Sequence, residues 1–280
     1  HVHLNDPGLT DSEDFYTGTC AAAAGGVTTV CEHPFTDPLP DNLKDYRDKQ
    51  EIADKKCIVD YCLWGACSHE NYEELKKMLD YGAIGFKAFL PYSAEVPAIN
   101  DKRLLKHMRL LAEKDTVLAV HCENDEVIQE KKEQINPSEY GNPIKFAESR
   151  PPLAEIESVS KVMMFAQETG ARVHIVHCST PEAIDIINYY QDKSVKATAE
   201  TGPQYLILDE ETLKEKGVFA VCAPPLRSKE SNKKMWDRIL KGNIYNLGSD
   251  HAPYTAEEKM EGKDNIFNTP TGMPGIQTMV

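Results

Sequence analysis

The stretch RVHIVHCSTPEAIDIINYYQDKSVKATAE, Arg172–Glu200, contains two short apolar runs separated by one helical segment. Arg172–His177 and Val195–Glu200 have the length and β-branched composition of strands. Between them, Ser179–Glu182 supplies a cap candidate, a first-turn proline and a first-turn acid, which together favour the start of a helix. A strand, a helix and a strand in this order predict two parallel strands joined by a covering helix.

The same alternation extends in both directions along the chain, and counting from Val27 gives seven β-then-α units. The predicted strands are Val27–Cys31, Cys57–Trp64, Ala83–Leu90, Thr116–His121, Arg172–His177, Val195–Glu200 and Ile244–Ser249. The predicted helices, besides the one that Ser179 opens, are Ser12–Ala24, His69–Tyr81, Asp101–Lys114, Leu153–Thr169 and Ser228–Lys241. Gln134–Pro152 is rich in Pro, Asn and Gly, which indicates an ordered, lid-like excursion.

An open doubly wound sheet and a closed barrel both satisfy this alternation. Residues with reactive side chains, however, recur at the carboxyl ends of the strands along the whole chain, and in a barrel those ends converge on one mouth. We therefore predict an α/β fold, a single (β/α)₈ TIM barrel over residues 1–280. The 280 residues are 41% hydrophobic, which is enough apolar material for such a core.

The composition argues against several classes of partner. The net charge of −14, from 31 basic and 45 acidic residues, would repel nucleic acids and anionic membranes. No apolar run has the length needed to span a bilayer. The cysteines form no CxxC pair, and we expect them to be reduced thiols of a cytoplasmic protein. They are Cys20, Cys31, Cys57, Cys62, Cys67, Cys122, Cys178 and Cys222.

Residues suited to metal binding occur near both ends and at the expected strand ends. His1 and His3 are two residues apart, so in a strand both would point to one face and could reach one metal ion. Lys87 lies inside the apolar run GFKAFL, where a buried lysine must be neutral, paired or modified. A core histidine or a packed lysine is the alternative for each residue taken alone.

Three further candidates stand at other strand ends: His121 ends TVLAVH, His177 ends RVHIVH, and Asp250 follows Gly248-Ser249. Metal-binding residue types at five strand ends indicate one shared site, because coincidence at so many ends is improbable. Amide hydrolysis fits such a site, since two cations about 3.5–4 Å apart can share a water, lower its pKa toward ~7 and polarise a carbonyl. Asp250 is the candidate that could accept the water's proton and deliver it to the leaving nitrogen.

Several motifs resemble those of the cyclic amidohydrolases of the amidohydrolase superfamily, the group of hydantoinase, dihydropyrimidinase, allantoinase and dihydroorotase. They are HVHLNDPG, TGTCAAAAGGVTTV, GFKAFL, VHCEN, SRPPLAEIE, HIVHCST, ETGPQYLILD, CAPPLR and GSDHAP. The resemblance implies two divalent metal ions, zinc first among them, with manganese, cobalt, nickel or iron as alternatives. The implied ligands are His1, His3 and Asp250 for one ion and His121 and His177 for the other. Lys87, N-carboxylated by CO2, would bridge both ions.

The residues expected around the substrate resemble different members of that group. Tyr92, five residues after Lys87, and Gln204 match hydantoinases and dihydropyrimidinases, as does the segment that contains Thr271. Asn5 stands where dihydroorotases carry an arginine, whereas the opening block is similar to allantoinases. Ala223 matches a position at which the family uses the backbone. The resemblance implies opening of a hydantoin or dihydropyrimidine ring, with allantoinase as the alternative and dihydroorotase less favoured.

Tyr92 has two interpretations. Its O–H could donate a hydrogen bond to the oxyanion that forms at the ring carbonyl, which would make it catalytic beside Asp250. A tyrosine at a strand end also serves packing alone.

The resemblance also implies features outside the site. Family members carry a flanking β-sandwich and more of the first strand, so residues 1–280 are expected to be a barrel domain truncated at both ends, and unstable when isolated. A homotetramer, or another homo-oligomer, is implied. The residues allow two tests against other kinds of protein. An inactive scaffold, like the collapsin-response-mediator proteins, would lack several of the ligands, and a one-metal hydrolase or deaminase would not need Lys87.

Overall fold

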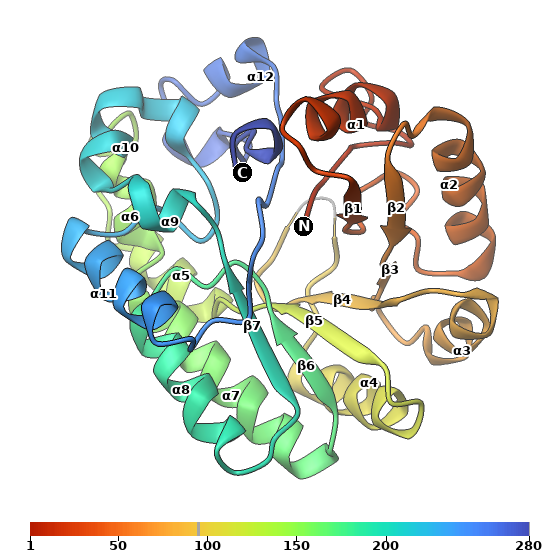
Figure 1. Ribbon diagram of the computed structural model, residues 1–280. Coiled ribbons are helices and arrows are strands. Elements are labelled where there is room, and N and C mark those ends of the chain that lie inside the picture. The colour runs from red at the N-terminus through yellow and green to blue at the C-terminus, as the bar shows by residue number, and fades with distance from the viewer. Residues whose placement is uncertain (94–95, 280) are drawn as a thin grey trace.

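In the computed structural model, which describes residues 1–93 and 96–279, a ring of parallel strands is surrounded by helices (Figure 1). One sheet has the strand order β3-β4-β5-β6-β7-β8, and β1 pairs with β2 in a second sheet. The strands are β1 (Thr29–Glu32), β2 (Asp60–Leu63), β3 (Gly65–Ala66), β4 (Gly85–Phe89), β5 (Val117–His121), β6 (Arg172–Ile175), β7 (Ala197–Thr201) and β8 (Asn246–Leu247). Each predicted strand is therefore confirmed, but most are shorter than predicted, β1 and β7 end one residue later, and Cys57–Trp64 is continued by β3.

The two sheets form one closed ring. Only Trp64 separates β2 from β3, and its N–H donates to the carbonyl of Glu32 in β1 (N···O 3.0 Å), so β2 and β3 occupy a single strand position. Val2 forms parallel bridges with Glu32 on one side and with His251 on the other. The opening residues thus take the first strand position, and the (β/α)₈ barrel is confirmed.

The helices lie outside this ring (Figure 1). The long ones are α1 (Phe15–Ala24), α2 (Leu43–Lys56), α3 (Tyr72–Tyr81), α4 (Asp101–Glu113), α5 (Asp125–Glu133), α7 (Pro152–Thr169), α8 (Pro181–Gln191) and α11 (Lys229–Leu240). The short ones are α6 (Ile144–Ser149), α9 (Gln204–Ile207), α10 (Glu210–Lys216) and α12 (Ala256–Met260), with 3₁₀ turns at Pro137–Glu139, Gly217–Ala220, Ile266–Asn268 and Ile276–Thr278.

Three sequence predictions about helices need correction. The sequence did not indicate α2 or α5. The excursion Gln134–Pro152 is not one irregular loop, because it contains a 3₁₀ turn and α6. The unit that begins with β8 continues, in the described residues, into the short α12 and not into a long covering helix.

Alternation along the strands separates the core from the interior of the barrel. Phe86, Leu118 and Val173, on three adjacent strands, are fully buried in the main core together with residues of α4 and α7. Their chain neighbours Lys87 and His174 point the other way, into the barrel, because successive side chains of a strand alternate in direction. The strands thus present their polar residues to the interior of the ring.

The cysteines agree with the sequence expectation of reduced thiols. All eight cysteines are free thiols, four of them buried and four partly buried. Within residues 1–93 and 96–279, no helix combines the length and the apolar character needed to cross a membrane.

Candidate metal centre

Residues from the two ends of the chain meet at the mouth of the barrel. Nε2 of His1 lies 3.2 Å from Nε2 of His3 and 3.2 Å from Oδ1 of Asp250, and Nε2 of His3 lies 3.3 Å from the same oxygen. One possible ligand atom from each of the three residues lies within 4.8 Å of the other two. Nitrogen and carboxylate atoms this close, on side chains with little exposure, form a suitable set of ligands for one divalent cation.

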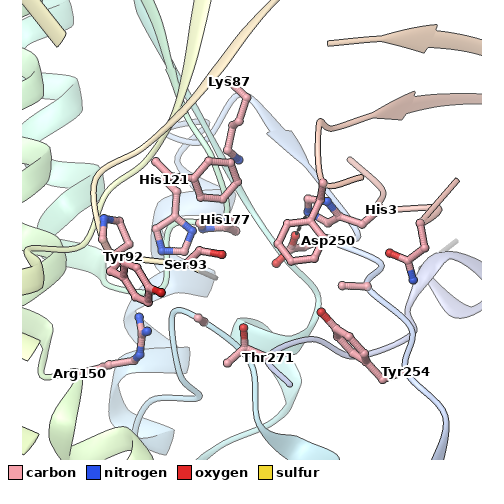
Figure 2. A pocket seen from close by; sticks show the side chains of 16 residues that line it. His3, Lys87, Tyr92, Ser93, His121, Arg150, His177, Asp250, Tyr254 and Thr271 are labelled. Carbon is pink, nitrogen blue, oxygen red and sulfur yellow. Dashed lines mark ion pairs between the residues drawn. The ribbon is translucent and has the colours of Figure 1, made fainter. Parts of the chain in front are cut away.

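His121 and His177 form a second group beside the first. Their ring centroids are 4.5 Å apart, edge to face, and His177 lies 5.7 Å from the ring of His1. His121 is the last residue of β5, and His177 follows β6 by two residues. Figure 2 shows these two rings on one side of Lys87, with His3 and Asp250 on the other.

Lys87 lies between the two groups and is fully buried. It occupies the middle of β4 and not its end, which corrects the expectation that it stands, like the other candidates, at a strand end. Its Nζ has no hydrogen-bond partner among the described residues. Burial lowers the pKa of Lys87 to about 8, although Asp250 and Glu200 favour the charged form. A substantial fraction of the amine is therefore neutral near pH 8.

Burial also sets the charge of the other ligands. It lowers the pKa of His3, His121 and His177, so these imidazoles are neutral and retain a lone pair for a metal. Burial alone would raise the pKa of Asp250, but the nearby His177 and His3 hold it below its usual value. The centre thus combines neutral imidazoles with one carboxylate anion, a donor set that fits Zn²⁺ and similar ions.

Two residues that the sequence did not single out hold His121 in place. Nε2 of His121 lies 2.8 Å from Oε2 of Glu123, and Nη1 of Arg150 lies 2.6 Å from the same oxygen. Burial would raise the pKa of Glu123, but Arg150 and His121 lower it to about 2. Because the anion accepts a hydrogen bond from the Nε2–H of His121, the lone pair of that ring is on Nδ1. VHCEN and SRPPLAEIE contain both residues, so the motifs offered a signal.

Two more neighbours of His1 were also missed. His33 is buried, and its ring is stacked 3.7 Å from the ring of His1. Glu200 accepts a hydrogen bond from Nδ1 of His1. Burial would raise the pKa of Glu200, but the hydrogen bond from His174 holds it well below its usual range. ETGPQYLILD begins with Glu200, whereas none of the quoted motifs contains His33.

Three site residues have backbone angles that only glycine adopts easily. The φ angle is 60° at Asn5, 39° at His177 and 48° at Asp250. A positive φ in a residue with a side chain is uncommon, costs of order 1–3 kcal/mol, and persists only where the surroundings enforce it. The strands therefore turn sharply at two of the ligands and at one candidate substrate residue.

A pocket opens over this centre. The ligands His3, Lys87, His121, His177 and Asp250 line it with four of the candidate substrate residues, Tyr92, Asn5, Ala223 and Thr271. Phe35, Phe89, Pro91 and Tyr254 add apolar and aromatic walls. Figure 2 shows Tyr92, Arg150, Thr271 and Tyr254 on the side of the pocket away from Lys87. Beyond them lies an outer cavity of about 600 Å³.

Gln204 is not brought to this pocket. It lines a separate cavity of about 300 Å³, which shares Asp250 with the metal centre and also contains Ile207 and Met273. The structure therefore gathers four of the five candidate substrate residues at the metal centre and places the fifth on the other side of Asp250.

The chain matches the amidohydrolase family over residues 1–274. It is 35% identical to an allantoinase of Deinococcus radiodurans, over 99% of this chain and 62% of that protein. It is 31% identical to an L-hydantoinase of Paenarthrobacter aurescens, over 99% of this chain and 61% of that protein. The solved structure of an L-hydantoinase (dihydropyrimidinase) from Arthrobacter aurescens has a TM-score of 0.97 at 31% identity, covering 100% of this chain and 63% of the other. The chain thus spans less than two thirds of these relatives, yet barrel, ligand set and similarity agree, and it belongs to the amidohydrolase family.

Proposed function

We propose that the protein hydrolyses the C–N bond of a cyclic amide of the hydantoin or dihydropyrimidine type. The observation that carries the proposal is the position of Lys87, a buried amine without a hydrogen-bond partner among the described residues, between two groups of metal-ligand side chains. An inactive scaffold would have no use for this arrangement. A one-metal site would leave the buried amine uncompensated.

Lys87 fits the role of a bridging ligand. Its neutral amine can add to CO2, forming one N–C bond and releasing one proton, which leaves a carbamate with two oxygens and one negative charge. That anion would lie between His121 and His177 on one side and His3 and Asp250 on the other. Two divalent ions held there, zinc first among the candidates, supply positive charge that lowers the pKa of a water and polarises the ring carbonyl.

The remaining chemistry belongs to groups around the substrate. Asp250, kept ionised by its neighbours, can accept the proton of the attacking water and deliver it to the leaving ring nitrogen. Tyr92 lines the pocket and is 68% exposed, so its O–H can turn toward the oxygen of the attacked carbonyl. Asn5, Thr271 and Ala223 line the same pocket, and we propose that the first two side chains and the backbone at Ala223 hydrogen-bond the rest of the ring.

The charges of the pocket favour a neutral ring over a substrate with a carboxylate. Asn5 carries no charge, and Arg150 is already paired with Glu123 at 2.6 Å. A dihydroorotate-like acid would therefore find no unpaired cation among the described lining residues other than Lys87.

Allantoin is the second candidate substrate. The Deinococcus relative named allantoinase is 35% identical to this chain, against 31% for the L-hydantoinase. In addition, Asn5, Arg150 and Thr271 add polar groups to the lining of the pocket, which suits a ureido substituent.

The test is an assay of the full-length protein with hydantoin, dihydrouracil, allantoin and dihydroorotate, with bound metals quantified. We expect about two divalent ions per chain and the highest kcat/KM on one of the three neutral rings. Light scattering of the same preparation tests the proposed homotetramer, and fractionation of cells tests the proposed cytoplasmic location. Metal-loaded protein that opens none of the neutral rings would contradict the proposed function.

A further inference from the structure

Glu200 is a buried carboxylate that touches the candidate metal centre without belonging to its ligand set. It lies in β7 and is 4% exposed. Its Oε1 accepts a hydrogen bond from Nδ1 of His1 and another from the backbone N–H of His177, with an N···O distance of 3.3 Å. One oxygen of Glu200 therefore contacts a residue from each of the two ligand groups.

The other oxygen of Glu200 is also surrounded by donors. Oε2 lies 3.2 Å from Nδ2 of Asn246 and 3.4 Å from Nε2 of His174. Nδ1 of His174 lies 2.8 Å from the hydroxyl of Thr198. That hydroxyl can donate to Nδ1, so the proton of a neutral His174 is on Nε2 and points at Glu200. Both oxygens of the carboxylate thus accept, and neither faces another acceptor among these contacts.

These contacts determine which nitrogen of His1 can bind a metal. A neutral imidazole has one N–H and one lone pair. Because Nδ1 donates to Glu200, the lone pair is on Nε2, the atom that lies 3.2 Å from both Nε2 of His3 and Oδ1 of Asp250. A carboxylate behind a metal-binding histidine fixes the orientation of the ring and makes it a better ligand.

We infer that Glu200 is a positioning residue: it fixes the tautomer and ring orientation of His1 and so sets the metal affinity of the position formed by His1, His3 and Asp250. The inference rests on the proposed function only in that it requires bound metal, not a particular substrate. His121, in the other group, has its own carboxylate, Glu123. The effect of Glu200 is therefore expected to fall mainly on one of the two metal positions.

Only a carboxylate of this length satisfies the surroundings. A glutamine would introduce an NH2 group among four donors, so at least one of them would face another donor. An aspartate would keep the negative charge, but its side chain is one methylene shorter, so the carboxylate would no longer reach Nδ1 of His1. The space offers little freedom, because a Cβ added at Gly248 would lie 2.5 Å from Oε2.

The experiment compares Glu200→Gln and Glu200→Asp with the parent in the full-length protein. Each protein is loaded with Zn²⁺, dialysed against a weak chelator and analysed for metal content. We expect the parent to retain two ions per chain and both variants to retain about one, with the affinity of the weaker position reduced roughly 10–100-fold. In Co²⁺-loaded protein, the visible absorption of one of the two ions should change. NMR of ¹⁵N-labelled histidine should show the Nδ1–H of His1 in the parent and its loss in Glu200→Gln.

Glu155→Gln is the matched control. Glu155 is equally buried, at 2% exposure, but it contacts Ser179, Thr180 and Arg227 and not the metal ligands. This variant should lose stability and keep two ions with the parent's absorption. A purely structural role of Glu200 would give the same result for Glu200→Gln, and that result overturns the inference. If one Glu200 variant fails to fold, the other decides, since each removes the contact with His1 differently.

The inference and the proposed function fail in different ways. If the parent binds two ions and the Glu200 variants bind one, the positioning role holds even when no cyclic amide is hydrolysed. If the parent hydrolyses a ring and all variants bind both ions equally tightly, the positioning role is wrong and the proposed function holds.

Discussion

At the scale of single residues, the two fully buried lysines among the described residues differ in whether they have an ionic partner. Lys49 is paired with Glu32, at an Nζ···Oε2 distance of 2.5 Å, whereas Lys87 has no such partner among the described residues. A buried amine without a partner is unfavourable unless something compensates it. The unpaired lysine lies among candidate metal-ligand side chains, which is why we propose that it is modified and does not serve packing alone.

Replacing Lys87 tests that assignment. Lys87→Ala should retain fewer than two metal ions per chain and lose activity by on the order of a thousandfold, because several kcal/mol of transition-state stabilisation depend on the metals. Added acetate should restore part of both, since a small carboxylate can occupy the vacated space. Lys49→Met, the control, should be less stable but retain its metals. Full metal content and activity in Lys87→Ala would show that the bridging role is wrong.

Replacing Tyr92 tests whether its O–H stabilises the oxyanion formed at the ring carbonyl. Tyr92→Phe removes the O–H and keeps the ring, so kcat should fall roughly 10²-fold with little change in KM or metal content. Steady-state kinetics and metal analysis measure all three. An unchanged kcat would mean that Tyr92 only packs against the pocket.

At the scale of elements, the sequence predicted the strands better than the helices. Each predicted strand was an apolar run bounded by turn residues, and burial on both faces of a parallel sheet produces that pattern. Helix α2 was missed because its buried residues are only Tyr46, Lys49 and Ala53, so one of the three positions facing the core carries a charge. A helix of this composition has no apolar periodicity to detect.

Lys87, His121, His177 and Asp250 could be singled out as candidate ligands because each lies in or directly beside an apolar run, but their supporting groups could not. The hydrogen bond between His1 and Glu200 joins residues separated by 199 positions, and it exists only because the ring of strands closes. Likewise, the stacking of His33 on His1 depends on the adjacency of the first two strand positions, which a single sequence does not reveal. Gln204 shows the converse, since its motif suggested a substrate contact and the fold placed it in a neighbouring cavity.

Arg227 connects several segments around the site, and replacing it tests how much these contacts contribute to stability. It donates from Nε to the hydroxyl of Ser179 at 2.9 Å and from Nη1 to the carbonyl of Arg150 at 2.5 Å, and it pairs with Glu155 of α7 at 3.4 Å. Arg227→Met should reduce the free energy of unfolding by about 3–5 kcal/mol, because the charge of Glu155 is left buried without its partner. Urea titration measures the loss. The double variant Arg227→Met/Glu155→Gln should recover much of the lost free energy of unfolding. A loss below about 1 kcal/mol in Arg227→Met alone would show that the pair does not hold these elements together.

At the scale of the whole molecule, the metals and the closure of the barrel involve the same segment. The strand position occupied by Val2 is held by few backbone hydrogen bonds, including His3 N–H to the carbonyl of His251 at 2.7 Å and Val2 N–H to that of Cys31 at 3.1 Å. His3 and Asp250, on opposite sides of this junction, are ligands of one proposed ion. Chelation should therefore lower Tm and increase hydrogen exchange first at residues 1–5 and 248–252. Uniform exchange over all strands would contradict this.

The same centre makes the stability of the metal-free protein depend on pH. Burial holds the pKa of His3, His121 and His177 below the ordinary value, so the folded state stays neutral at pH values where the unfolded chain, with pKa near 6.5, binds protons. Stability then falls as the pH drops below about 6.5, by at most about 1.4 kcal/mol per histidine and pH unit. Glu32 acts in the opposite direction, because burial raises its pKa to about 7.

Comparison of variants separates the pH dependence that comes from the buried histidines from the opposite dependence that comes from Glu32. Urea unfolding of metal-stripped protein at pH 7.5 and 5.5 should give a smaller pH-dependent loss for His177→Asn than for the parent, because one buried imidazole no longer contributes. His69→Asn replaces an exposed histidine and should match the parent. Saturating Zn²⁺ should raise stability at pH 7.5 more than at pH 5.5, since protons compete with the metal for the same lone pairs. An equal loss in His177→Asn and the parent would mean that the pKa of His177 is the same in the metal-free fold as in the unfolded chain, and the neutral ligand set deduced for this centre would be wrong.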